Sequence, residues 1–157
     1  MKNPKKIKIK SFKDNRGEFL KFLSSKQKKL ILKNKLSEVN ISINKNKGTI
    51  RGMHYQTKFK EKKLVLCLKG EVVDYCINLK SGKVHRFKLN DKSREFLFVP
   101  EGFAHGFQSI KNDTVLLYIH SNKYSPSNEK TINPFDPKYK LRWPIKKYTI
   151  SKKDLYS

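Results

Sequence analysis

The sequence predicts an all-β protein, built as an antiparallel sandwich or barrel. From Ile43 onward, apolar segments of strand length recur along the chain. Turn-forming groups such as Ser81-Gly82 and Pro100-Glu101-Gly102 separate them. Within residues 71–79, apolar and polar side chains alternate. Short alternating segments at this spacing are typical of antiparallel sheets.

The expected strands follow one another closely. We assign them to residues 48–51, 63–68, 71–79, 84–89, 95–99, 104–110 and 114–120. In the strand 71–79 one face carries Val73, Tyr75, Ile77 and Leu79, and the other carries Asp74 and Asn78.

The remaining segments give weaker signals. Residues 24–36 are rich in lysine and carry consecutive rather than helically spaced apolar residues, so we expect a loop or a short helix. After Pro126 the chain is rich in proline and lysine, and we expect neither strand nor helix there. No repeat or linker is evident, which predicts a single domain over residues 1–157 with one hydrophobic core.

The net charge of the chain is +24, with 37 Lys and Arg against 13 Asp and Glu. Such an excess by itself suggests nucleic acid, a membrane surface or a phosphorylated substrate as the partner. The basic residues are mostly lysines spread over strands and loops alike, whereas nucleic-acid surfaces cluster arginine with aromatic residues. We therefore predict no nucleic-acid partner and no membrane partner.

The cysteines and the apolar stretches indicate the cellular compartment. Cys67 and Cys76 lie inside apolar segments, so we expect two buried free thiols rather than a disulfide. No apolar stretch has the length of a signal peptide or a membrane span. We expect a soluble, cytoplasmic protein.

Three segments place ionisable groups in or beside expected strands, namely Arg51-Gly-Met-His54-Tyr-Gln56, Pro100-Glu-Gly-Phe-Ala-His105-Gly-Phe and Leu117-Tyr118. In a regular strand Arg51 and His54 face opposite sides, and they share a face only if a bulge intervenes at Gly52. Taken singly, His54 is more often a packed residue than a catalyst, and Tyr118 is equally a core aromatic. His105 is equally a structural hydrogen-bonding residue.

Metal and nucleophilic chemistry find little support in the sequence. His54, His105 and His120 are scattered, without the close His-x-His spacing of metal-binding cupins, so we predict no metal and no other cofactor. No Gly-x-Ser-x-Gly motif is present.

The ordered motifs resemble the dTDP-4-dehydrorhamnose 3,5-epimerase family, from Asp14 to Asp154. The matching segments are Arg51-Gly-Met-His-Tyr-Gln, Lys63-Leu-Val, Gly70-Glu-Val-Val-Asp, Phe98 to Phe107, Leu117-Tyr118, Tyr124-Ser-Pro and Trp143-Pro. The resemblance implies a cupin-like double-stranded β-helix, or jelly roll, that forms a homodimer. It also implies an isomerase that epimerises C3, C5 or both of a nucleotide-linked 4-keto-6-deoxyhexose, for deoxysugar and surface-polysaccharide biosynthesis.

The resemblance further implies roles for individual residues. His54 matches the base, Asp154 the carboxylate that orients it, and Tyr118 the acid that returns a proton on the opposite face. Lys63 matches a lysine beside the keto oxygen. The other substrate-binding candidates are Arg51 at the diphosphate, Gln56, His105, Tyr124, Lys153 and Arg16, the last reaching across from a second copy of the chain.

The chemistry of a 4-keto sugar agrees with these residue types. Loss of hydrogen from C3 or C5 leaves an enolate whose charge spreads to the carbonyl oxygen. Inversion therefore needs a base, a cation near that oxygen and an acid on the other face. Histidine, lysine or arginine, and tyrosine supply these groups at neutral pH.

The sequence departs from the family near Lys21 and residues 39–41, where the family usually carries acidic and amide residues that frame the nucleotide base. A GDP- or CDP-linked substrate therefore stays open beside a dTDP-linked one. A 3-epimerase, a sugar-nucleotide 3,4-ketoisomerase and a non-catalytic sugar-nucleotide-binding cupin also stay open. A nucleic-acid binder, the reading that the net charge favours, predicts binding that weakens steeply with salt.

Overall fold

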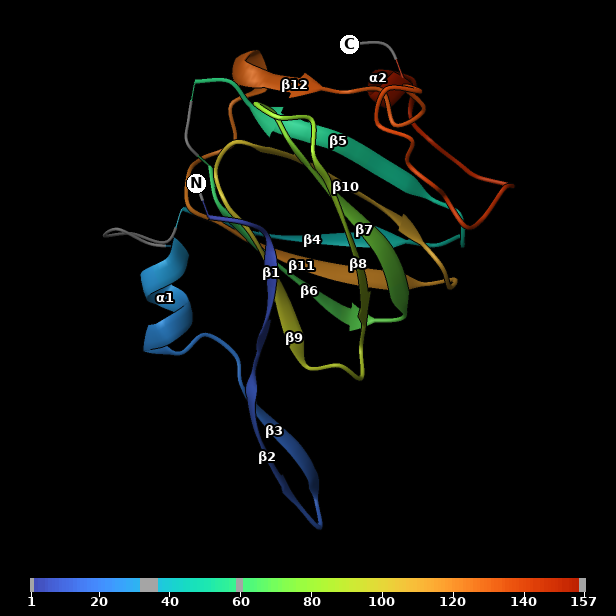
Figure 1. The fold of residues 1–157 in the computed structure, drawn as a ribbon. Coiled ribbons are helices and arrows are strands. Elements are labelled where there is room, and N and C mark those ends of the chain that lie inside the picture. Colours follow the sequence, from blue (N-terminus) through green and yellow to red (C-terminus); the bar gives the residue numbers. More distant parts are fainter. Residues whose placement is uncertain (1, 32–36, 59–60, 156–157) are drawn as a thin grey trace.

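The computed structural model describes residues 2–31, 37–58 and 61–155, which form two five-stranded antiparallel sheets packed face to face (Figure 1). The first sheet has the strand order β1-β9-β6-β11-β4, with β1 Lys5–Lys8, β9 Glu95–Val99, β6 Lys63–Lys69, β11 Thr114–His120 and β4 Glu38–Asn44. The second has the order β12-β5-β10-β7-β8, with β12 Glu129–Thr131, β5 Ile50–Gln56, β10 Phe103–Ser109, β7 Glu71–Asn78 and β8 Val84–Asn90.

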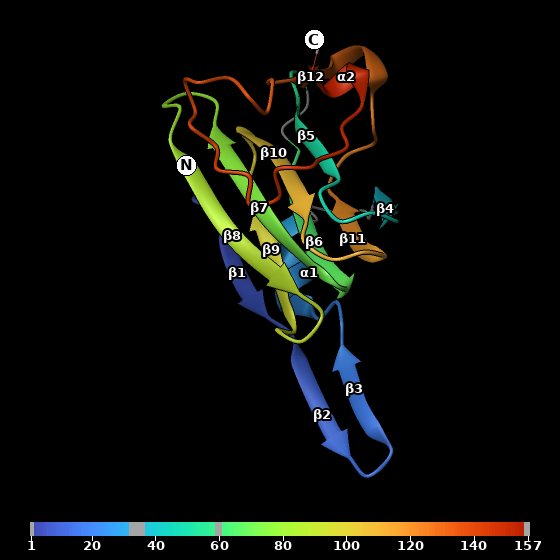
Figure 2. The same cartoon turned by 90° about the vertical axis from the view of Figure 1, so that its right-hand side faces the viewer.

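The shorter elements lie around this sandwich. Strands β2 (Lys10–Asp14) and β3 (Gly17–Lys21) form a hairpin that projects from one end (Figure 2). Helix α1 (Ser25–Ile31) lies over the first sheet, because Ile31 packs against apolar residues of β6 and β9. The 3-10 turn η1 (Pro126–Asn128) precedes β12, and helix α2 (Lys152–Leu155) lies beside β5 at the end opposite the hairpin (Figures 1 and 2).

Both faces of the central strands are buried, which explains the consecutive apolar residues of β6. Val65 and Cys67 pack between the sheets, whereas Leu64 and Leu66 pack under the N-terminal segment and α1. A third cluster lies on the outer face of the second sheet, where Trp143 covers Tyr75 with ring centroids 4.9 Å apart. The expectation of one core was therefore wrong, because the described buried residues form three clusters.

The expected strands from residue 63 onward are confirmed to within two residues of their ends. The strand expected at 48–51 begins at Ile50 and runs on to Gln56. Residues 24–36, for which a loop or a short helix is expected, contain the short helix α1, and residues 32–36 lie outside the described part of the chain.

The prediction of neither strand nor helix after Pro126 was wrong. Strand β12 forms there because its backbone pairs with β5, with Lys130 opposite Tyr55, rather than because of an apolar pattern. Helix α2 has four residues, too few to show a helical period.

Two simpler expectations can be compared directly with the structure. Cys67 and Cys76 are free and buried, as predicted. Within the described ranges, no helix combines the length and the apolar character that crossing a membrane requires.

Candidate active site

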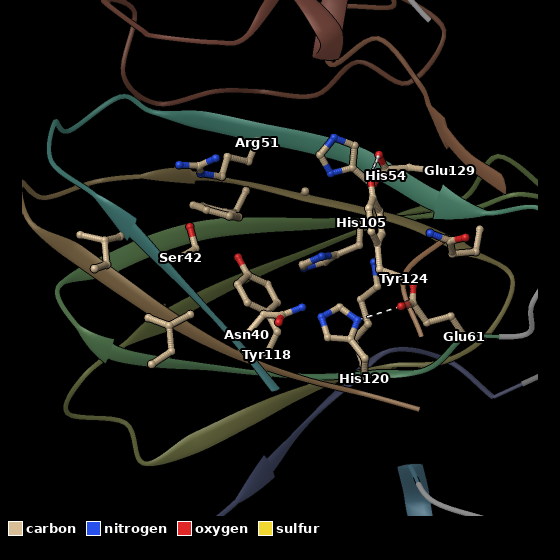
Figure 3. A pocket seen from close by; sticks show the side chains of 16 residues that line it. Asn40, Ser42, Arg51, His54, Glu61, His105, Tyr118, His120, Tyr124 and Glu129 are labelled. Carbon is tan, nitrogen blue, oxygen red and sulfur yellow. Dashed lines mark hydrogen bonds and ion pairs between the residues drawn. The ribbon is translucent and has the colours of Figure 1, made fainter. Parts of the chain in front are cut away.

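A cavity of ≈ 350 Å³ lies between the two sheets, bordered by β5 and β10 on one side and by β4 and β11 on the other (Figure 3). Most of its lining is polar or ionisable. These lining residues are Asn40, Ser42, Arg51, His54, Gln56, Glu61, Lys63, His105, Tyr118, His120, Tyr124 and Glu129.

A β-bulge in β5 brings Arg51 and His54 to the same cavity. His105 of β10 lies opposite His54, and Phe107 lies opposite Arg51, so two steps along β10 correspond to three along β5. The extra residue shifts the alternation, and both side chains line the cavity. The condition that the sequence sets, a bulge at Gly52, is met.

Gly52 and Gly106 allow this bulge because their backbones are in close contact. A Cβ on Gly52 would lie 2.5 Å from the Cα of Gly106. A Cβ on Gly106 would lie 2.7 Å from the carbonyl oxygen of Arg51. Gly52 also has φ of +120°, a conformation that L side chains rarely adopt. A side chain at either position would push apart the strands that carry His54 and His105.

His54 is hydrogen-bonded to Asp154, a residue that α2 brings back to the sheet. His54 Nε2 lies 2.8 Å from Asp154 Oδ1, and the other carboxylate oxygen accepts the Gly52 N–H at 3.2 Å. Burial alone would raise the pKa of Asp154, but the hydrogen bonds from His54 and Gly52 outweigh it and lower this pKa. An ionised carboxylate only accepts hydrogen bonds, so the proton of neutral His54 lies on Nε2 and Nδ1 is the basic atom.

Side chains at the rim of the cavity hold α2 in place. Lys153 forms an ion pair with Glu129, which also accepts a hydrogen bond from the Tyr124 hydroxyl at 2.9 Å. Tyr124 and Glu129 line the cavity, whereas Lys153 lies at its rim. The residue after Lys153 is Asp154, so these contacts also help to place the partner of His54.

Tyr118 enters the cavity from β11, on the wall opposite His54 (Figure 3). Its ring packs edge-on against His105, with centroids 6.4 Å apart. Burial, together with the negative charge of Asp74, raises the pKa of Tyr118 well above its ordinary value. The hydroxyl is therefore protonated at neutral pH and can donate a proton.

A second histidine–carboxylate pair lies deeper in the fold. His105 Nε2 is 2.8 Å from Asp74 Oδ2, and both side chains are buried. Burial raises the pKa of Asp74, and the adjacent His105 opposes this shift. Sequence reasoning placed Asp74 on the face opposite Val73 but did not identify it as the partner of His105. A carboxylate inside an otherwise apolar strand was the signal.

Lys63 belongs to a third group that the sequence did not reveal. Its Nζ lies 3.1 Å from Glu61 Oε2, and Glu61 Oε1 lies 2.8 Å from His120 Nδ1. The sequence presents His120 only as a scattered nitrogen donor, and no pattern in the sequence singles out Glu61.

The other predicted residues differ in position. Arg51 Nε donates a hydrogen bond to Asn44 Oδ1 at 2.9 Å, and Gln56 lines the cavity. Arg16 is not brought to the cavity of its own chain. It is exposed in the turn of the projecting hairpin and pairs with Asp14 at 2.7 Å. Among the described residues, no group of three or more His, Cys, Asp or Glu side chains is arranged to hold a metal ion.

Solved structures of sugar-nucleotide epimerases match this fold over nearly the whole chain. A dTDP-6-deoxy-D-glucose-3,5-epimerase from Legionella pneumophila, in complex with dTDP-4-keto-L-rhamnose, is 30% identical with a TM-score of 0.87, over 96% of this chain and 84% of that one. A dTDP-4-dehydrorhamnose 3,5-epimerase from Bacillus anthracis, with TDP and PPi bound, is 27% identical with a TM-score of 0.89, over 96% and 90% of the two chains. The fold and its cavity define a cupin-like jelly-roll isomerase.

Sequence comparison identifies the family. The model of the family described as dTDP-4-dehydrorhamnose 3,5-epimerase matches residues 1–157. The dTDP-4-dehydrorhamnose 3,5-epimerase of Shigella flexneri is 32% identical over 153 residues, in a match that covers 93% of this chain and 84% of that relative. The chain belongs to the dTDP-4-dehydrorhamnose 3,5-epimerase family. The predicted fold class, family and isomerase class are confirmed, and the roles of individual residues stay predictions.

Proposed function

We propose that the protein epimerises C3 and C5 of a dTDP-linked 4-keto-6-deoxyhexose. The observation that carries this proposal is the placement of the His54–Asp154 pair and Tyr118 on opposite walls of one cavity that also holds Lys63 (Figure 3). The names of the matched relatives, and the dTDP-4-keto-L-rhamnose in the Legionella pneumophila structure, support the choice of substrate.

In this mechanism His54 Nδ1 removes the proton from a carbon beside the keto group. The electron pair of the broken C–H bond forms a C=C bond to C4, and the π pair of the carbonyl moves to its oxygen. The enolate oxygen that results is stabilised by the ammonium of Lys63. The imidazolium that forms on His54 is stabilised by the Asp154 carboxylate at 2.8 Å. The Tyr118 hydroxyl then protonates the same carbon from the opposite face, which inverts its configuration. Proton exchange with water restores His54 and Tyr118.

The remaining contacts of the substrate are assigned to the open side of the cavity. Arg51 is held by Asn44 and is the proposed contact of the diphosphate. Tyr124, which is 46% exposed at the rim, is assigned to the nucleotide side. His105 and Gln56 are assigned to the sugar, and Lys153 to the rim.

We also propose that the protein acts as a homodimer in which residues 1–157 of each copy form one domain. The projecting hairpin exposes Phe12 at 48% and Phe19 at 69%, and the edge strand β4 exposes Ile41 at 60% and Ile43 at 65%. Apolar side chains on a free hairpin and on a sheet edge favour cover by another chain. Such pairing would carry Arg16 toward the second copy. The cytoplasmic location stays a prediction from the sequence.

Deuterium exchange tests the reaction. We expect incubation with a dTDP-linked 4-keto-6-deoxyglucose in heavy water to place deuterium at C3 and C5, and a chelator to leave the rate unchanged. Exchange at C3 alone would make the protein a 3-epimerase, and transfer of the carbonyl to C3 would make it a 3,4-ketoisomerase. Parallel incubations with GDP- and CDP-linked substrates test the nucleotide. The epimerase proposal fails if neither carbon exchanges with any of the three.

A further inference from the structure

The lower wall of the cavity carries a buried group that the proposed mechanism uses only in part. Lys63 belongs to it, but Glu61 and His120 have no role in the proton transfers. We propose that His120 binds the substrate by accepting a hydrogen bond from a ring hydroxyl of the sugar, and that Glu61 is a positioning residue that holds His120 and Lys63. This inference rests on the proposed function for the identity of the substrate.

One carboxylate joins the other two side chains. Glu61 precedes β6, Lys63 begins β6 and His120 ends β11, where Lys63 and His120 are register partners across the sheet. Glu61 Oε1 lies 2.8 Å from His120 Nδ1, and Glu61 Oε2 lies 3.1 Å from Lys63 Nζ. The three side chains are only 8%, 14% and 13% exposed, in the order Glu61, His120, Lys63. Their orientations are therefore set by packing and by each other.

The charge of Glu61 determines which ring nitrogen of His120 carries a hydrogen. Burial alone would raise the pKa of Glu61, but the hydrogen bond from His120 and the charge of Lys63 outweigh it and lower this pKa. The ionised carboxylate only accepts, so Nδ1 of His120 carries a hydrogen. Lys63 already balances the charge of Glu61. A neutral imidazole therefore leaves the group without net charge and gives Nε2 a free lone pair.

The free nitrogen belongs to a ring that faces the cavity. Figure 3 shows His120 beside Tyr118, and their ring centroids are 6.0 Å apart. In the described part of the chain, Nε2 of His120 has no hydrogen-bond partner. This part of the lining therefore offers a hydrogen-bond acceptor, Nε2 of His120, beside the ammonium of Lys63.

Acceptors select the hydroxyl groups of the ligand. A diphosphate and a keto oxygen carry no hydrogen to donate, whereas the ring hydroxyls of a hexose do. Lys63 is the proposed contact of the keto oxygen at C4, so an acceptor next to it lies within reach of the hydroxyl on C3 and of the one on C2 beyond it. A fixed hydrogen bond there would hold the ring in one orientation between His54 and Tyr118.

Binding of an unreactive ligand tests the contact. dTDP-glucose carries ring hydroxyls but no keto group, and dTDP lacks the hexose. Calorimetric titration with both ligands therefore separates binding of the hexose from binding of the nucleotide. We expect His120→Ala to weaken the binding of dTDP-glucose about 2- to 10-fold, the range of one neutral hydrogen bond. Its affinity for dTDP should be unchanged. The 2-deoxy and 3-deoxy analogues of dTDP-glucose identify the hydroxyl that His120 contacts. The analogue that lacks this hydroxyl should bind to His120→Ala and to the unaltered protein with equal affinity.

Variants of Glu61 separate positioning from contact. Glu61→Ala should weaken the binding of dTDP-glucose as much as His120→Ala does. The double variant should lose no more affinity than either single variant. Glu61→Gln keeps an oxygen that accepts from Nδ1, so it should retain the affinity for dTDP-glucose while lowering kcat, because Lys63 loses its ion pair. Glu71→Gln is the matched control, since it removes the Glu71–Lys88 ion pair of 3.0 Å outside the cavity lining.

Two results would overturn the inference. If His120→Ala binds dTDP-glucose with unchanged affinity, or loses as much affinity for dTDP as for dTDP-glucose, His120 does not contact the hexose. If the losses of binding free energy in Glu61→Ala and His120→Ala add up in the double variant, Glu61 does not act through His120. Neither result needs turnover, so a failure of this inference is distinguishable from a failure of the deuterium exchange that tests the epimerase itself. Retained dTDP binding by each variant shows that its fold is intact.

Discussion

His54 and Asp154 are 100 residues apart in the chain, yet His54 Nε2 lies 2.8 Å from Asp154 Oδ1. Asp154 is only 5% exposed. A buried carboxylate is costly unless hydrogen bonds compensate for its lost hydration, and here His54 and the Gly52 N–H supply them. Its partner is the proposed base.

The first prediction concerns this pair. Asp154→Asn removes the charge that stabilises the His54 imidazolium and allows the wrong tautomer, so we expect a loss of about 10²–10⁴ in kcat, by analogy with the carboxylate of a catalytic triad. The measurement is steady-state kinetics of Asp154→Asn, His54→Ala and the double variant, whose effects should be strongly non-additive. Asp136→Asn, in an outer turn, is the control. Full activity in Asp154→Asn would leave His54 without a functional partner.

The second prediction separates the base from the acid. His54→Ala should lower deuterium exchange at C3 and C5 by about 10²–10⁴, because no group then removes the proton. Tyr118→Phe should block epimerisation but retain part of the exchange, since the carbon is still deprotonated and can regain a proton from the same face. Product analysis by NMR in heavy water distinguishes these outcomes, with Tyr139→Phe as the control. Unchanged epimerisation in Tyr118→Phe would assign this ring to packing.

The third prediction concerns the contact between Gly52 and Gly106. A Cβ on Gly106 would lie 2.7 Å from the carbonyl oxygen of Arg51, so Gly106→Ala must displace the β5 bulge. We expect a cost of about 1–3 kcal/mol in the free energy of unfolding. Displacement of His54 by about 1 Å should also lower kcat/KM by about 10²-fold.

Gly82→Ala is the control for the third prediction. A Cβ on Gly82 meets no atom closer than 4.0 Å, although its φ of +70° is unfavourable for alanine. We expect it to lower stability and leave kcat/KM unchanged. Equal loss of kcat/KM in both variants would show that the bulge has no special part in the site.

The fourth prediction concerns stability and pH. The pKa of Glu61 is lowered in the folded protein, so its ionised form stabilises the fold above the ordinary glutamate pKa, and this stabilisation is lost as pH falls through the lower folded-state value. Glu61→Gln should therefore be less stable than the unaltered protein at neutral pH, and the difference should shrink below about pH 4. Urea unfolding over this range measures it. A difference that does not depend on pH would contradict the linkage.

The success of the strand predictions depended on the apolar content of each strand. Strands β6 to β11 were recognised because they carry apolar side chains between turn residues. Strand β1 was missed because lysine occupies three of its four positions, and β2 because four of its five residues are polar or charged. Strand β4 was missed although Val39, Ile41 and Ile43 alternate with polar residues along it. The N-terminal strands form through pairing with neighbours, as Ile7 does opposite Phe96, and a local pattern does not show such pairing.

The sequence by itself determined the fold class, the family and the set of residue types at the candidate site, because turn chemistry, strand periodicity and ordered motifs are local properties. Only the tertiary structure decided which of these residues meet. The β5 bulge depends on the Gly52–Gly106 contact between two strands. The carboxylates beside His105 and His120 are Asp74 and Glu61, 31 and 59 residues away along the chain. Strand alternation assigns a side chain to a face of its own strand, whereas its hydrogen-bond partner depends on how the sheets close around the cavity.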